Sequence, residues 1–269
     1  MKLAICSEIF NDWKDVLRVI KYAKQIGYDG LEIAPFTLAP DVKFISTDTR
    51  KAIVDIAGEV GLEIVGLHWL LAGTEGYHLT HPDKAVRDRT AQYVIDLTQF
   101  CSDIGGRVMV FGSPQQRNVM EGVTYDQAFS NAIEVFGKAL PVCANLGVTI
   151  CMEPLTHLET NFCTSAEETV RLIDAIDHPN FRLILDVKAM AFETEKHRTL
   201  IRQYAKYVAH FHANDENLRA PGTGDVDFAP IFQALRDINY QGFMAVEVFN
   251  FEEGPETIAE NSLTYLRKF

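Results

Sequence analysis

Four residues with metal-binding or acid–base side chains stand where apolar, strand-like runs of the sequence end. A polar group at the end of such a run lies at the edge of a hydrophobic core, where an unpaired carboxylate is costly. Their recurrence in four successive runs predicts one shared site. The four are Glu153 after Val148–Met152, Asp186 after Phe181–Leu185, His212 in the run from Tyr207, and Glu247 after Met244–Val246.

A divalent cation offsets the cost of burying these charges. Two glutamates, one aspartate and one histidine form an oxygen-rich ligand set, unlike the closed, sulfur-rich set of structural zinc. Such a set suits Mn²⁺, with Mg²⁺ or Co²⁺ as alternatives, and leaves positions open for substrate. The other interpretation is four unrelated capping or salt-bridging groups.

The elements that must position these residues are strands alternating with helices. Eight β-rich runs recur, with helical apolar spacing between them, and Thr164-Ser165 offers a helix cap. Alternation implies a parallel sheet, and eight units in 269 residues imply a (β/α)₈ TIM barrel that forms a single domain over residues 1–269. A doubly wound open sheet is the alternative, weakened because no Gly-x-Gly-x-x-Gly or Walker sequence follows a strand. The eight runs are Leu3–Phe10, Gly30–Pro35, Glu63–Leu70, Arg107–Gly112, Val148–Pro154, Phe181–Val187, Tyr207–His212 and Phe243–Phe249.

Composition and charge limit the classes of function. The net charge of −12, from 25 Lys and Arg against 37 Asp and Glu, disfavours nucleic acid and anionic membranes as partners. No apolar stretch approaches the roughly 18 residues that span a bilayer, and Met1–Glu8 fits a first strand better than a secretory signal. Five cysteines without a Cys-x-x-Cys pair predict a reduced, cytoplasmic setting and exclude a zinc ribbon.

The strand ends also carry a family resemblance. The chain resembles the xylose isomerase-like TIM barrel superfamily of sugar isomerases and epimerases, nearest to the D-tagatose/D-psicose 3-epimerases and the hydroxypyruvate isomerases. The likeness spans nearly the whole chain and is strongest between Val148 and Phe249. The motifs that carry it are Met152-Glu153-Pro154-Leu155, Leu185-Asp186, His210-Phe211-His212-Ala213-Asn214-Asp215, Pro221-Gly222-Thr223-Gly224 and Val246-Glu247-Val248.

The resemblance implies a reaction. In such epimerases the four matching residues bind one metal ion, and the residues matching Glu153 and Glu247 exchange protons with opposite faces of a carbon beside a ketone. A metal that chelates the carbonyl stabilises the enediolate formed on proton loss. The expected substrate is a small keto sugar, or its acid or phosphate derivative. A homodimer or a homotetramer is left open.

Further residues are candidates for substrate binding. Glu159 matches a substrate-contacting glutamate of the epimerases, and His68 and Trp69 end the third run. His210 lies one layer deeper than His212, so we interpret it as a core or supporting histidine.

The sequence departs from the epimerase pattern at two positions. Ala189 replaces a substrate-binding histidine, and Leu218 replaces an arginine. We therefore interpret Lys188, Arg219 and Arg117 as cations that hold a carboxylate, a phosphate or an enolate oxygen. Lys188 is alternatively an acid/base group.

Other functions remain to be weighed. A lyase or dehydratase that acts on a 3-keto sugar would abstract the same proton and then eliminate. A zinc-dependent apurinic endonuclease shares the barrel but needs more histidines and a basic surface. A sugar-binding barrel without catalysis is the third alternative.

Overall fold

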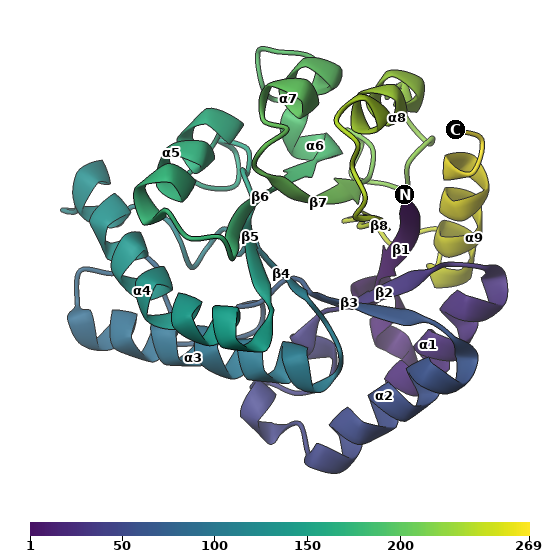
Figure 1. Ribbon diagram of the computed structural model, residues 1–269, viewed down its shortest axis with the longest axis horizontal. Helices are drawn as coiled ribbons and strands as arrows, with labels where there is room; N and C mark the ends of the chain where they lie inside the picture. The colour runs from purple at the N-terminus through teal and green to yellow at the C-terminus, as the bar shows by residue number, and fades with distance from the viewer.

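Eight parallel strands close into a barrel in the order in which they occur in the chain. The computed structural model describes residues 1–269 and has β1 paired with β8, which completes the ring. In Figure 1 the strands surround the centre and the helices lie outside them. The predicted single-domain (β/α)₈ TIM barrel is confirmed. The strands are β1 (Lys2–Cys6), β2 (Gly30–Ile33), β3 (Glu63–Leu67), β4 (Val108–Phe111), β5 (Thr149–Met152), β6 (Phe181–Asp186), β7 (Val208–Ala213) and β8 (Phe243–Val246).

Most strands are shorter at their carboxyl ends than the apolar pattern predicts. The first expected strand runs to Phe10, but the chain leaves the sheet after Cys6 and forms a 3₁₀ helix, η1 (Ser7–Trp13). Ile9 and Phe10 are buried within this helix, so the apolar pattern continues after the sheet has ended. Burial and strand pairing are separate properties, and only burial is visible in the pattern.

Helices connect the strands and begin and end at local signals. The cap predicted at Ser165 is present, because its side chain accepts a hydrogen bond from the backbone N–H of Glu168. Gly27 and Gly147 end their helices with φ of 112° and 65°, in the left-handed region that favours glycine. The remaining helices are α1 (Val16–Ile26), η2 (Pro35–Thr37), η3 (Val42–Phe44), α2 (Thr47–Val60), α3 (Lys84–Asp103), α4 (Tyr125–Leu146), α5 (Ala166–Ile176), α6 (Val187–Met190), α7 (His197–Gln203), α8 (Phe228–Asp237) and α9 (Pro255–Leu266).

The two faces of the sheet have different interiors. The outward face packs on the helices in one large apolar core, while the inward face carries two small separate clusters, Ala4, Cys6, Val65 and Ala245, and Val110, Cys151 and Ile184. Because side chains alternate along a strand, the residue two positions further along points the same way. Glu153 follows Cys151, Asp186 follows Ile184, and Glu247 follows Ala245 at that spacing. The barrel therefore directs all three carboxylates toward its axis at one mouth.

All five cysteines are buried and unpaired. Two of them, Cys6 and Cys151, belong to the inward-facing clusters, where they act as small apolar side chains. No helix is both long enough and apolar enough to cross a membrane.

The amino terminus of α4 offers a test of the local capping. Thr124 accepts from the backbone N–H of Gln127, and the Gln127 side chain accepts from the backbone N–H of Thr124. We expect Thr124→Ala to lower the free energy of unfolding by about 1 kcal/mol in urea denaturation. Thr124→Ser keeps the hydroxyl, so its free energy of unfolding should lie within about a few tenths of a kcal/mol of the wild-type value. Equal losses in both variants would contradict this account of the cap.

Candidate active site

Glu153, Asp186, His212 and Glu247 meet at the mouth of the barrel. Each offers one ligand atom, and these atoms all lie within 4.8 Å of one another. Asp186 is the last residue of β6 and His212 lies in β7, whereas Glu153 and Glu247 come directly after β5 and β8. All four side chains are buried. The structure thus brings together the four residues that the strand ends suggested.

The electrostatics of this group fit a cation. Burial, together with the charges of Glu247 and Asp186, raises the pKa of Glu153 to about 8. Burial likewise raises the pKa of Asp186, although Lys188 opposes it. Three buried carboxylates repel one another, and an imidazole that offers a lone pair beside them completes a set that favours a hard divalent ion. The residues present therefore fit the metal that the family resemblance implies.

A buried glutamate from β2 holds the histidine of this group. His212 places Nδ1 3.0 Å from Glu247 Oε2 and Nε2 3.4 Å from Glu32 Oε1. The other oxygen of Glu32 lies 2.7 Å from His210 Nε2. Burial acts to raise the pKa of Glu32, but the two histidines together hold it below its usual range. His210 is therefore a supporting residue, as its deeper position in the strand suggested.

Glu153 is held through its backbone and the space around it. A Cβ at Gly112, at the end of β4, would overlap Glu153 Oε2, so this glycine makes room for the carboxylate. Arg117 is fully buried and donates to three carbonyl oxygens, those of Glu153 at 2.6 Å, Cys163 at 3.0 Å and Gly112 at 3.3 Å. All three hydrogen bonds of its guanidinium therefore go to backbone carbonyl groups. Arg117, predicted to bind substrate, lies outside the cavity lining, and its hydrogen bonds hold the loop that carries Glu153.

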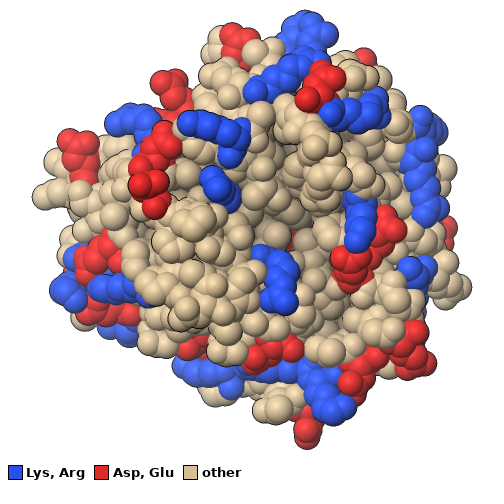
Figure 2. Space-filling view, viewed as in Figure 1, with Lys and Arg blue, Asp and Glu red and all other residues tan.

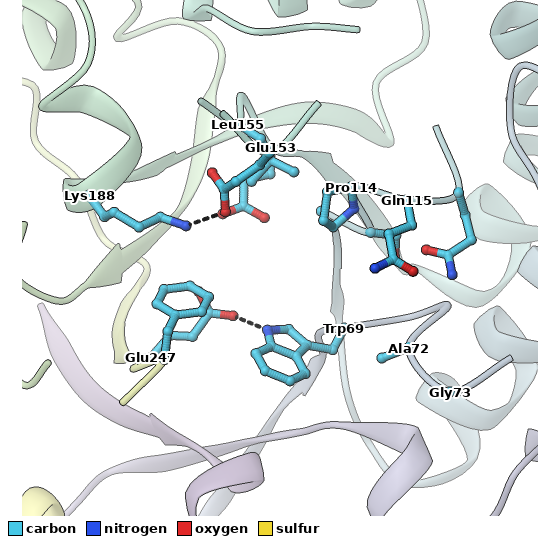
Figure 3. Close-up of a pocket in the computed structure, with 14 residues that line it drawn as sticks. Trp69, Ala72, Gly73, Pro114, Gln115, Glu153, Leu155, Lys188 and Glu247 are labelled. Carbon is cyan, nitrogen blue, oxygen red and sulfur yellow. Dashed lines mark hydrogen bonds and ion pairs between the residues drawn. The ribbon is translucent and has the colours of Figure 1, made fainter. Parts of the chain in front are cut away.

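A cavity of about 390 Å³ opens above the four-residue group. Glu153 and Glu247 reach it from different sides, Trp69 lies beside Glu247, and Lys188 extends into it (Figure 3). Asp186 and His212 do not line it. Charged side chains lie mostly around the periphery of the face drawn in Figure 2, and few of them are visible in the hollow at its centre. The residues that complete the lining include Gln115, Gln116, Glu159 and Phe249.

Lys188 is the single cation in the cavity wall. Its Nζ donates to Glu159 Oε1 at 2.7 Å and lies 3.9 Å from the ring centroid of Phe249. Burial acts to lower the pKa of Lys188, but Asp186, Glu153 and Glu159 hold it above its ordinary value. The lysine is therefore a cation already paired with Glu159. Lys188 lies in α6, which begins at Val187, so its direction into the cavity is set by the helix and not by the alternation of strand β6.

Two further residues that we predicted to bind substrate lie outside the cavity wall. His68 is fully buried, lies outside the cavity lining, and bonds through Nε2 to Glu8 Oε2 at 2.7 Å. Arg219 lies on the surface, where it pairs with Glu252 at 2.6 Å and Glu253 at 3.3 Å. The structure does not bring either residue to the cavity, because each side chain is engaged by a partner that the sequence pattern does not reveal. The neighbouring Trp69 and the expected Glu159 do line the cavity.

Sequence reasoning missed several residues of the site. Gln115 and Gln116 line the cavity in the stretch from which we selected Arg117 on its charge. One indication of Glu32 was present in the sequence: it is an acidic residue inside the apolar run that forms the buried strand Gly30–Ile33. Phe249 stands two residues after Glu247, at the spacing that places it on the same side as the carboxylate.

Comparison with known proteins gives a family and several named relatives. A family model described as "Xylose isomerase-like TIM barrel" matches residues 20–269. D-psicose 3-epimerase of Ruminiclostridium cellulolyticum is 25% identical over 245 residues, covering 89% of this chain and 80% of that protein. The 3-dehydro-D-guloside 4-epimerase of Escherichia coli K12 is 21% identical over 276 residues, covering 99% of both chains.

Solved structures share the barrel over its whole length. The apo structure of 3-keto-D-glucoside 4-epimerase from E. coli superimposes with a TM-score of 0.86 at 21% identity and covers 100% of both chains. D-psicose 3-epimerase with D-tagatose, from Clostridium cellulolyticum H10, gives a TM-score of 0.86 at 21% identity, covering 100% of this chain and 99% of the other. The fold is therefore the one used by these epimerases.

The space beside Glu153 gives a test of the metal centre. Gly112→Ala should weaken Mn²⁺ binding about 10- to 100-fold in calorimetric titration, because the added Cβ displaces the Glu153 carboxylate. Gly137→Ala, in α4, is the matched control. A Cβ at position 137 has no neighbouring atom within 4 Å, and alanine favours the helix over glycine. Equal affinity in Gly112→Ala and wild type would contradict the placement of Glu153 among the ligands.

Proposed function

The chain belongs to the xylose isomerase-like TIM barrel family, and from that premise we propose that it is a metal-dependent sugar epimerase or isomerase. Its named relatives are epimerases, so the isomerase/epimerase class of enzyme follows from kinship. The reaction proposed here is proton transfer at a carbon beside the ketone of a keto sugar.

One observation carries the proposal. Among the four clustered residues, only Glu153 and Glu247 also line the cavity. They can therefore contact both a metal ion and a substrate, whereas Asp186 and His212 would hold the metal ion alone. The two carboxylates come from β5 and β8 and reach one cavity from different sides (Figure 3). This is the arrangement that removal of a proton from one face of a carbon and its return to the other require.

A divalent ion, with Mn²⁺ the best match to three carboxylates and one imidazole, would polarise the carbonyl and stabilise the enediolate. The chain's own residues do the rest. Glu153 and Glu247 accept and return the proton, and Trp69 and Phe249 contribute apolar surface of the cavity wall for the carbon skeleton. Gln115 and Gln116 supply amide groups for hydroxyls, and Lys188 directs a positive charge into the cavity.

The charges of the cavity favour an uncharged sugar over an acid or a phosphate. Its wall carries three carboxylates, Glu153, Glu159 and Glu247, against the single cation Lys188. Lys188 is paired with Glu159, while Arg117 and Arg219 are engaged elsewhere. The charge of a bound divalent ion would be balanced by the carboxylates that hold it, so no unpaired cation remains to bind a phosphate.

The five cysteines support the cytoplasmic location expected from the sequence. All are unpaired and buried, and two fill the barrel interior, where a disulfide would have no place. Free, structurally used thiols are typical of a reducing compartment.

Solvent-hydrogen exchange tests the proposed reaction. We expect deuterium to enter at the carbon beside the ketone of D-fructose, D-psicose, D-tagatose or L-ribulose in ²H₂O with Mn²⁺, and the exchange to stop with a chelator. Glu153→Gln and Glu247→Gln should each lower the exchange rate about 10²- to 10⁴-fold, measured by NMR. Glu63→Gln, an exposed acid at the start of β3, is the control. Full activity in Glu153→Gln would exclude the assigned role, and an unsaturated product would indicate β-elimination.

Sugar phosphates test the charge argument. We expect kcat/KM for an uncharged ketose to exceed that for its phosphate at least about tenfold, equivalent to ~1.4 kcal/mol. Arg219→Gln should leave both values unchanged, because that arginine binds surface acids. A preference for the phosphate would contradict the assignment of an uncharged substrate while leaving the proton transfer intact.

A further inference from the structure

A row of stacked side chains crosses the mouth of the barrel beside the cavity. We call Phe36, Trp69, Phe249 and Lys188 the aromatic row. The rings of Phe36 and Trp69 stack with centroids 5.7 Å apart and planes 18° apart. Trp69 and Phe249 stack at 6.1 Å and 21°, and Lys188 Nζ lies 3.9 Å from the Phe249 centroid. The row links the loops that follow β2, β3 and β8 to α6.

Trp69 occupies an unusual backbone conformation at the centre of this row. Its φ of 49° lies in the left-handed region, which is uncommon for a bulky residue and is retained only where the surroundings over-determine it. The two flanking rings supply that restraint. They fix the plane of the indole and, with it, the direction of its N–H.

The indole N–H is aimed at the site. Trp69 Nε1 donates to Glu247 Oε1 at 2.7 Å (Figure 3). His212 Nδ1 lies 3.0 Å from Glu247 Oε2. Oε1 of Glu247 is thus held by a donor that lies just after β3, and Oε2 lies beside the His212 nitrogen within the four-residue group. Glu153 differs, because the donor that reaches it, Arg117, binds its backbone carbonyl and leaves the carboxylate free toward the cavity. The two carboxylates of the site are therefore restrained unequally.

We propose that Trp69 is a positioning residue: its indole N–H, fixed by the aromatic row, sets the orientation of the Glu247 carboxylate toward the substrate. The proposal rests on the proposed function insofar as Glu247 is taken to transfer the proton. A carboxylate free to rotate would spend little of its time aligned with the reacting C–H, and misalignment of this kind slows the chemical step more than binding. The indole ring can still contact the sugar, so the ring face and the N–H donor must be tested separately.

The chain offers a matched pair of variants, because Trp13 and Trp69 are its two tryptophans. Trp69→Phe keeps an aromatic ring in the row but removes the donor. Trp13→Phe makes the same change in η1, where Trp13 packs on Phe10 and Tyr22. On the sugar that wild type converts fastest, we expect Trp69→Phe to lower kcat about 10- to 100-fold, the usual effect of losing a hydrogen bond to a charged group. KM should stay within about twofold, and Trp13→Phe should behave as wild type.

A second readout does not depend on activity. In ¹⁵N-labelled Trp13→Phe protein a single indole N–H signal remains, that of Trp69. We expect it to be shifted downfield and protected from solvent exchange, and to move upfield and exchange faster when Glu247→Ala is added, with a smaller change for Glu247→Gln. An indole signal indifferent to Glu247→Ala, or a Trp69→Phe enzyme with unchanged kcat, would overturn the proposal.

The two proposals fail in different ways. Wild-type protein that exchanges no hydrogen on any sugar would remove the proposed function, while the indole signal would still decide whether Trp69 holds Glu247. A Trp69→Phe enzyme in which only KM rises would assign the indole to substrate contact and remove its positioning role.

Discussion

Mutual repulsion among Glu153, Asp186 and Glu247 is the constraint on which the site depends. Three carboxylates buried within a few ångströms of one another are unfavourable without positive charge. Lys188 supplies part of that charge, and a divalent ion bound by the four-residue group would supply the remainder. The barrel stabilises this grouping. Its ring of hydrogen-bonded strands and its outer apolar core hold the strand ends at fixed distances. The stability of the fold thus maintains an arrangement that would otherwise disperse.

Three of the four clustered residues are positioned by a neighbour that lies in or beside a different strand. Glu32 of β2 holds His212 of β7, and Trp69 after β3 holds Glu247 after β8. Gly112, at the end of β4, leaves room for Glu153. Because the first two of these contacts join strands that are not neighbours in the ring, the geometry of the site depends on the whole barrel. Changes far from the metal ligands in sequence will therefore alter it.

Strand periodicity made much of the site predictable. The (β/α)₈ barrel followed from eight alternating units, and the inward direction of Glu153, Asp186 and Glu247 follows from an alternation that sequence displays directly. Lys188 and Trp69 reach the cavity from positions just past a strand, where a helix start and a left-handed residue set their directions. The sequence identified both as candidates, but not the partners that orient them.

The type of a residue does not show which groups its side chain contacts once it lies in a loop. Arg117 and Arg219 were selected because guanidinium groups bind anions, yet backbone carbonyls surround the first and surface acids pair with the second. Glu32 escaped notice since its partners, His210 and His212, lie 178 and 180 residues away in the chain. No local pattern reports such distant neighbours. Gly112 was likewise visible as a glycine but not as the space that Glu153 occupies.

The central claim is that Glu153, Asp186, His212 and Glu247 together form one metal centre. The most direct measurement is anomalous X-ray diffraction from crystals grown with Mn²⁺, which locates the ion without reference to activity. The account predicts one strong peak per chain, within coordination distance of all four side chains. A peak at another place, or four side chains satisfied by protein hydrogen bonds alone at saturating Mn²⁺, would contradict it.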